Sequence, residues 1–205
     1  IGDLYEDLLT PDIPLISSVG IDTVTNEMHI EWNENLQEDT YGYVIYTFND
    51  DGILFELDTV YGVSNTQYNY PISFENGPFS YSVAAFDSCE TSSTPVTYQT
   101  SAKAQVHTSM VASSLVFMCE QEAELTWSTY GGSTIDFYEI WSLSDGIWNL
   151  HEITEDTSVL ITVNANQSYT VYINALFVFT AANGDELYGF IDEGLVIFFS
   201  EPDEN

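Results

Sequence analysis

Apolar and polar residues alternate along much of this chain, which is the pattern of a half-buried β-strand. The clearest example is the stretch Phe79–Cys89, in which a Tyr, an aliphatic residue and an Ala share one face. The stretch Ser168–Leu176 repeats this arrangement. No segment keeps a helical period, and turn residues recur about every ten positions. The chain is therefore predicted to be all-β.

Five further strands are expected in the first half, separated by clusters of turn residues. In the second of them, Met28, Ile30 and Trp32 are expected to point inward. Asn49-Asp50-Asp51-Gly52 is a strong hairpin signal. The five strands are Ile13–Val19, Met28–Trp32, Tyr41–Phe48, Ile53–Val60 and Gln67–Tyr70.

The second half repeats the order of the first, with matched positions about 95 residues apart. The matched pairs are Trp32 with Trp127, Tyr43 with Tyr138, and Gly52 with Gly146. This duplication predicts two immunoglobulin-like β-sandwiches in tandem. The expected divisions are a lead-in or linker at 1–12, a first domain at 13–112 and a second domain at 113–205.

Charge is the unusual feature of the composition. The chain has 33 acidic residues and one basic residue, Lys103, which gives a net charge of −32. The acids are spread evenly along the chain and no basic patch can form, so nucleic acid is not expected as a partner and anionic membranes are disfavoured. No apolar run reaches the roughly 20 residues of a membrane helix, so membrane insertion is not expected.

These landmarks together resemble the fibronectin type III fold, over about 190 residues of the chain. In this resemblance Trp32 and Trp127 are the core tryptophans. Tyr81 and Tyr169 are the strand tyrosines whose hydroxyls bind nearby backbone. The resemblance implies modules that space or present binding surfaces, with no catalytic role.

A narrower set of segments is similar to tandem repeats in large secreted proteins of Bacteroidota, which often carry a sorting domain for type IX (gliding-associated) secretion. The segments include Pro11–Pro14, Gly42–Tyr46, Ala84–Cys89 and the run from His107 to Cys119 followed by Leu125–Trp127. This chain departs from those repeats in its near-absence of Lys and Arg and in extra residues between Cys89 and His107. The similarity implies an extracellular or cell-surface location.

Cys89 and Cys119 are the only cysteines, and an extracellular β-protein with two cysteines is expected to form one disulfide. That bond requires the Cα atoms to lie within about 7 Å, so the chain between them would have to double back. The alternative is two free or intermolecular thiols.

Clusters of acids offer oxygen ligands, and Asn49, Asp50 and Asp51 form the best candidate for calcium. The loop Glu34–Asp39 and Gly184-Asp185-Glu186 are weaker candidates, and none matches an EF-hand loop. The alternative at each is a solvated turn. No other cofactor is expected.

No catalytic motif is found in the sequence. His29, His107 and His151 fall in different predicted elements without the spacing of zinc ligands. Nucleophile elbows and phosphate loops are missing. We therefore expect a protein that is not an enzyme.

Several aromatic residues are not all expected to fit inside the two cores, and they either pair across strands to cover a sheet face or form an exposed strip that could contact a protein or stack on sugars. They are Tyr41, Tyr61, Tyr68, Tyr70, Trp141 and Trp148. The leading hypothesis is a non-catalytic extracellular structural or adhesion module that binds a protein partner. The alternatives are a self-associating filament subunit joined by strand addition and divalent cations, and a carbohydrate-binding region of a secreted enzyme.

Overall fold

The computed structural model describes residues 10–22, 24–49, 51–72, 78–90, 98–118, 121–164, 167–180, 186–190 and 195–200. In these ranges, side chains are described except at 89–90, 178–180, 186–190 and 195–200. All regular structure in the described ranges is β-strand, so no helix there is long and apolar enough to cross a membrane. The predicted all-β class is confirmed.

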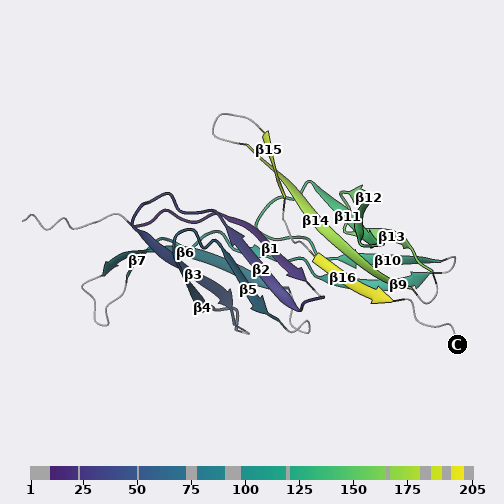
Figure 1. Ribbon diagram of the computed structural model, residues 1–205, viewed down its shortest axis with the longest axis horizontal. Helices are drawn as coiled ribbons and strands as arrows, with labels where there is room; N and C mark the ends of the chain where they lie inside the picture. The colour runs from purple at the N-terminus through teal and green to yellow at the C-terminus, as the bar shows by residue number, and fades with distance from the viewer. Residues whose placement is uncertain are drawn as a thin grey trace, which may run out of the picture. The chain divides into compact units, whose positions relative to one another are not determined.

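The first sandwich is built from two sheets, with strand orders β1-β2-β5 and β4-β3-β6-β7, and β8 also pairs with β6 (Figure 1). The strands are β1 (Ile16–Asp22), β2 (Glu27–Trp32), β3 (Thr40–Phe48), β4 (Leu54–Tyr61), β5 (Gln67–Pro71), β6 (Ser80–Glu90), β7 (Tyr98–Thr100) and β8 (His107–Thr108).

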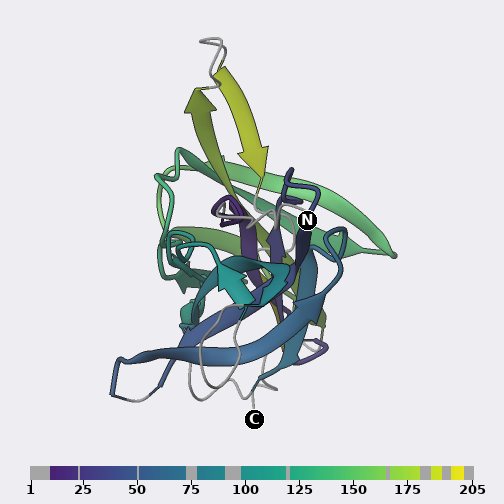
Figure 2. The ribbon, with the colours of Figure 1, turned by 90° about the vertical axis from the view of Figure 1, so that its left-hand side faces the viewer.

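The second sandwich repeats this plan, with orders β13-β10-β9 and β12-β11-β14-β16. In addition, β15 pairs with the far end of β14 (Figure 2), and β16 pairs in parallel with the end of β1. The strands are β9 (Ala112–Met118), β10 (Glu122–Trp127), β11 (Phe137–Ser144), β12 (Ile147–Thr154), β13 (Ser158–Thr162), β14 (Ser168–Thr180), β15 (Glu186–Phe190) and β16 (Leu195–Ser200). Because β9 to β14 follow the order of β1 to β6, the predicted tandem of fibronectin-type sandwiches is confirmed.

Each sandwich has the same aromatic contact in its core. The rings of Trp32 and Tyr43 meet edge to face at 5.2 Å, and those of Trp127 and Tyr138 do so at 5.5 Å. The Tyr43 hydroxyl accepts a hydrogen bond from the Asn35 backbone amide at 2.9 Å and donates one to the Val63 carbonyl at 2.8 Å. Burial raises the pKa of both tyrosines. The repeat in sequence is therefore also a repeat in packing.

The first strand begins three residues later than expected. Pro14 is buried and has no amide hydrogen, so it cannot join the sheet, and β1 starts at Ile16. The alternation predicted for β2 holds, since Met28, Ile30 and Trp32 are buried while the residues between them are half-buried.

The described chain forms two compact units. One comprises Ile1–Ile16, Glu31–Tyr68 and Tyr81–Gln105, and the other Ser17–Ile30, Asn69–Ser80 and Val106–Asn205. Each unit combines several segments of the chain that lie close together in space, so the units do not correspond to two consecutive halves of the sequence. The predicted domain boundary between residues 112 and 113 therefore stays a prediction.

Candidate functional site

The outer face of the β4-β3-β6 sheet carries the main candidate site. Tyr43 and Ile45 of β3 point into the core, so Gly42 before them and Val44 between them face outward. On β6, Phe86 lies opposite Gly42 and therefore shares that outer face. Tyr61 of β4 lies opposite Gly42 on the other side.

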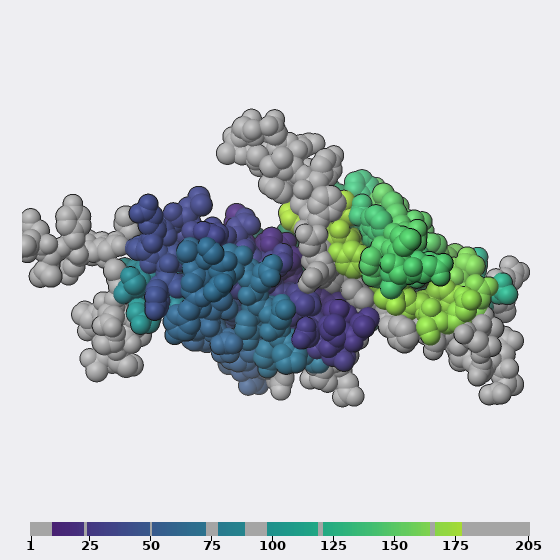
Figure 3. All heavy atoms as spheres, in the orientation of Figure 1, coloured from purple at the N-terminus to yellow at the C-terminus, as the bar shows by residue number. Residues whose placement is uncertain are grey.

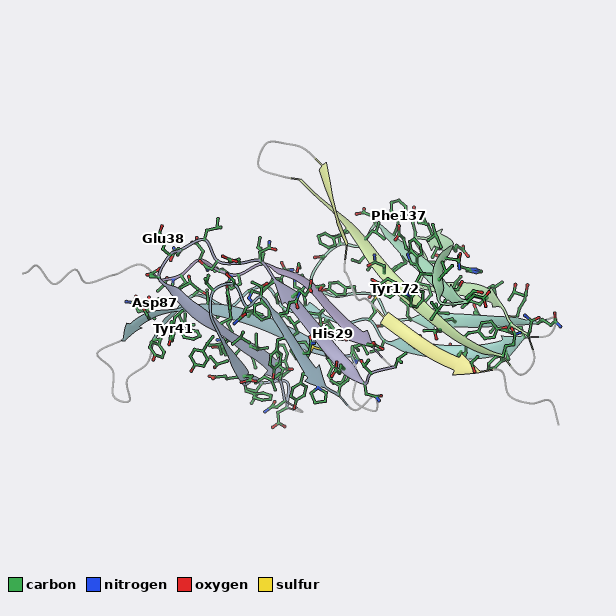
Figure 4. The ribbon with its side chains drawn as sticks, in the orientation of Figure 1. His29, Glu38, Tyr41, Asp87, Phe137 and Tyr172 are labelled. Atoms are coloured by element: carbon green, nitrogen blue, oxygen red, sulfur yellow. The ribbon has the colours of Figure 1, made fainter. Side chains whose placement is uncertain are left out.

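A β-bulge in β3 brings a further aromatic residue, Tyr41, to the outer face beside Gly42. Thr40 pairs with Asp87 and Gly42 pairs with Phe86, which leaves Tyr41 as the extra residue on β3. Tyr41 and Asp87 accordingly lie at the same end of the β3–β6 pair (Figure 4). The bulge breaks the alternation that would otherwise point Tyr41 into the core.

Four rings meet at this point, and we call Tyr41, Tyr61, Phe86 and Tyr98 the aromatic platform. Phe86 is 3% exposed, and its ring lies 5.9, 5.8 and 5.5 Å from those of Tyr41, Tyr61 and Tyr98. The three tyrosines are 48%, 58% and 41% exposed. The platform is thus a buried Phe that supports three half-exposed Tyr rings.

Gly42 makes room for this arrangement. A Cβ at Gly42 would lie 2.9 Å from two ring atoms of Phe86 and would collide with the Val60 carbonyl oxygen. The ring of Phe86 therefore rests directly on the backbone of β3, a close approach that glycine allows.

The single basic residue of the chain lies on the same sandwich. Lys103 Nζ is 4.4 Å from the ring centre of Tyr46, an outward residue of β3. Burial and, to a smaller degree, the Glu56 carboxylate raise the pKa of Tyr46. Lys103 is the only Lys or Arg of the chain, against 33 Asp and Glu residues. The protein that presents the platform is therefore strongly anionic.

The sequence identified part of the platform. Tyr41 and Tyr61 were expected to be exposed, and they are, as are Tyr70 and Trp148. Tyr68 and Trp141 are half-buried. Phe86, Tyr98 and Gly42 were missed. The position of Phe86 directly after the inward Ala85 was a usable signal, because neighbouring strand residues face opposite sides.

The second sandwich exposes aromatic and apolar residues on its corresponding sheet. Trp148 of β12 lies 6.0 Å from Tyr172 of β14, and Trp141 Nε1 donates a hydrogen bond to Glu139 Oε2 at 3.1 Å. Phe137 and Tyr172 come from the neighbouring strands β11 and β14 (Figure 4).

The calcium candidate is a hairpin turn. Asn49 Oδ1 accepts hydrogen bonds from the backbone amides of Asp51 and Ile53 at 3.1 and 2.9 Å. Asp50 lies outside the described residues, as do Gly184 and Asp185. Within the described part of the chain, no three His, Cys, Asp or Glu side chains gather as metal ligands would. Calcium binding at this turn stays a prediction.

The cysteine pair cannot be placed. Cys119 lies outside the described residues, and Cys89 is described only as a backbone position near the end of β6. The disulfide therefore stays a prediction.

The two strand tyrosines do not lie at equivalent positions. Ala85 pairs with Tyr43 and Ala175 pairs with Tyr138, so Val171 and not Tyr169 is the counterpart of Tyr81. Tyr169 of β14 accepts a hydrogen bond from the backbone amide of Asn164 at 2.6 Å, which is the type of bond expected of it. Tyr81 of β6 is buried.

The three histidines lie apart in the fold. His29 Nδ1 is 2.9 Å from Asn69 Oδ1, and His151 Nε2 is 3.1 Å from the Leu160 carbonyl oxygen. His107 is buried, its Nδ1 lies 2.8 Å from the Tyr130 hydroxyl, and burial lowers its pKa. Each has a partner of its own, so they do not form a common site.

Comparison with known proteins found similar solved structures but no matching family. No family model matches the sequence, and no curated protein matches it. Similar solved structures include the FN1–FN3 domains of chicken CNTN1, at 15% identity and a TM-score of 0.34, covering 94% of this chain and 66% of that one. A two-domain fibronectin type III segment of chicken tenascin shows 13% identity and a TM-score of 0.29, covering 89% of this chain and 98% of that one. The central fibronectin-III array of RIM-binding protein shows 14% identity and a TM-score of 0.32, and the match covers 93% of this chain and 62% of that one.

Proposed function

We propose that this chain is a non-catalytic binding module of a secreted or cell-surface protein, in which a β-sandwich presents an aromatic surface to another protein. The observation that carries the proposal is the aromatic platform, with three half-exposed Tyr rings over one buried Phe. Contiguous exposed apolar patches on folded domains commonly mark interaction sites. Tyr is also among the residues enriched at protein interfaces and their energetic centres.

The orientation of the rings favours a protein over a polysaccharide. Stacking on successive sugar rings requires aromatic faces that lie near one plane. Here Tyr41 is tilted 75° from Tyr61 and 45° from Tyr98. Rings set at such angles form a corrugated surface, which suits the side chains of a protein better than a flat glycan chain.

The charge of the chain favours a basic partner. With a net charge of −32, the chain repels acidic surfaces and attracts cationic ones. Lys or Arg side chains could also lie over the exposed Tyr faces, as Lys103 does over Tyr46.

Two sequence features support an extracellular location. The chain resembles repeats of secreted Bacteroidota proteins. It also contains a single site, Lys103, for proteases that cut after Lys or Arg. Such a composition suits an exterior rich in proteases.

The experiment is a selection from a random-peptide phage library on the immobilised chain at physiological salt. We expect enrichment of peptides that combine basic and aromatic residues. Their binding should weaken about tenfold or more on a Tyr41→Ser, Tyr61→Ser, Tyr98→Ser variant. A matched control replaces Leu15, Leu36 and Ile53, which are exposed on the same sandwich, with Ser and should keep binding.

A parallel pull-down with insoluble cellulose and chitin tests the carbohydrate alternative. Retention on either polymer, lost in the triple Tyr variant, would assign the platform to sugars and contradict the proposal. Peptides that bind the triple Tyr variant as well as the wild type would also contradict it.

A further inference from the structure

Strand β12 is an exposed apolar edge. It is the last strand of its sheet, and no strand in the described part of the chain pairs with its outer edge. Seven of its eight residues are exposed, including Ile147 at 64%, Trp148 at 42%, Leu150 at 46% and Ile153 at 53%. The segment around residue 150, in mid-green, accordingly lies at the surface (Figure 3).

Edge strands are normally protected from pairing by charged residues, prolines or short length. The equivalent strand of the first sandwich, β4, follows this rule and carries the exposed acids Glu56 and Asp58. Strand β12 has eight residues, no proline and one acid, Glu152. The β4 edge thus carries two exposed acids, whereas β12 carries one and exposes four large apolar residues.

The position of β12 is fixed from two sides. It pairs with β11 along its inner edge, and its bulged residue His151 donates a hydrogen bond to the Leu160 carbonyl of β13 at 3.1 Å. The Trp148 ring packs against Tyr172 of β14. An added strand would thus meet an edge that is already in place, which lowers the entropic cost of binding.

Acids surround this edge, and the second sandwich supplies no positive charge of its own. Asp145, Glu152, Glu155 and Asp156 are exposed within or beside β12, and residues 113–205 contain no Lys or Arg. A segment that pairs here gains from basic residues that face these carboxylates.

We propose that β12 binds an extended segment of another protein by strand addition, and that this segment alternates apolar and basic residues. Main-chain hydrogen bonds to the free edge would provide affinity. One row of side chains would contact Trp148, Leu150 and Ile153, and basic residues would pair with the acids. A second copy of this chain does not fit, because each copy brings a net charge of −32 to the contact.

The probe is a fluorescent ten-residue peptide of alternating Val and Lys, measured by anisotropy at physiological salt. A peptide of the same sequence with N-methyl groups on alternate residues keeps the charge but loses the hydrogen-bonding edge. The protein variant is Leu150→Lys, and its control is Phe55→Lys on β4, the equivalent strand of the first sandwich, where Phe55 is 42% exposed. Ile153→Lys serves as a second variant, and thermal melts confirm that each protein is folded.

We expect N-methylation to abolish binding, and Leu150→Lys and Ile153→Lys to weaken it about tenfold, with less than a twofold change for Phe55→Lys. Equal binding of the N-methylated peptide would reduce the interaction to net charge and overturn the proposal. Equal effects of Leu150→Lys and Phe55→Lys would do the same, as would no binding at all. A dimer of the free chain that Leu150→Lys dissociates would show that the occupant is a second copy, and it would overturn the proposal as well.

Discussion

At the scale of single residues, the platform depends on the absence of a side chain at Gly42. The Phe86 ring occupies the space that a side chain at position 42 would need. Tyr41, Tyr61 and Tyr98 then pack around that ring. One glycine and one outward Phe thus determine where three tyrosines are exposed.

Gly42→Ala should therefore destabilise the fold and disrupt the platform. The added methyl group collides with Phe86 and with the Val60 carbonyl, and overpacking of this kind costs about 1–3 kcal/mol. Urea denaturation measures the loss. As a control, Gly52→Asn places a side chain in open space at a left-handed turn position and should cost less than about 1 kcal/mol. Equal losses for the two variants would contradict the role of Gly42.

His107 should make the free energy of unfolding depend on pH. Burial lowers the pKa of His107, and its ring contacts the Tyr130 hydroxyl, whose own pKa is raised by burial. The unfolded chain therefore binds a proton at a higher pH than the folded chain does. Stability from this group is complete above the unfolded pKa of about 6.5 and is lost as the pH falls through the lower folded value.

Comparison with His107→Gln isolates this effect, because protonation of the many carboxylates acts on both proteins. Denaturation at pH 7.5 and pH 5.5 should show that the wild type loses more stability, or gains less, than the variant. The same pH dependence in both proteins would mean that His107 does not contribute.

At the scale of elements, the sequence predicted most of the fold. Alternation located β2, β3, β6 and β14, and the repeat with a spacing of about 95 residues located β10 and β11 as the counterparts of β2 and β3. These strands were predictable because one face of each is buried, so burial imposes a period of two on the sequence.

The platform was only partly predictable, for a physical reason. It depends on the bulge at Tyr41 and on the register that sets Gly42 opposite both Tyr61 and Phe86. Register across strands joins residues that are far apart in the sequence, and alternation within one strand does not specify it. The exposed edge of β12 was missed for a similar reason, because an apolar strand resembles a buried one until its neighbours are known.

The second sandwich allows a direct contrast between a buried and an exposed tryptophan. Trp127 is 3% exposed and packs on Tyr138, whereas Trp148 is 42% exposed on β12. Trp127→Ala should cost about 3–5 kcal/mol, and Trp148→Ala less than about 1 kcal/mol. Urea denaturation of both variants checks the difference. A large loss for Trp148→Ala would mean that β12 is covered in solution.

At the scale of the whole molecule, charge sets the conditions under which the fold is stable. Folding brings the acids of this chain, 33 against a single Lys or Arg, closer together than they are in the unfolded chain. Their mutual repulsion extends about 30 Å in 0.01 M salt but only about 8 Å in 0.15 M salt. The acidic surface therefore opposes folding mainly at low ionic strength.

Thermal stability should accordingly rise as NaCl increases from 0.01 to 0.15 M, and it should change less between 0.15 and 0.5 M. Scanning calorimetry over this range measures the midpoint. Sucrose at matched osmolality is the control, since it does not screen charge. A midpoint that is independent of salt below 0.15 M would contradict the importance of repulsion.

If the platform and the β12 edge bind a basic protein and not another copy of this chain, the chain alone should stay monomeric. Light scattering measures its mass in about 0.02 M and about 0.15 M salt, each with and without millimolar calcium. The binding-module hypothesis predicts a monomer of 23.0 kDa under all four conditions. Calcium-dependent growth into large species would contradict it and support a filament subunit with the acidic clusters as metal sites.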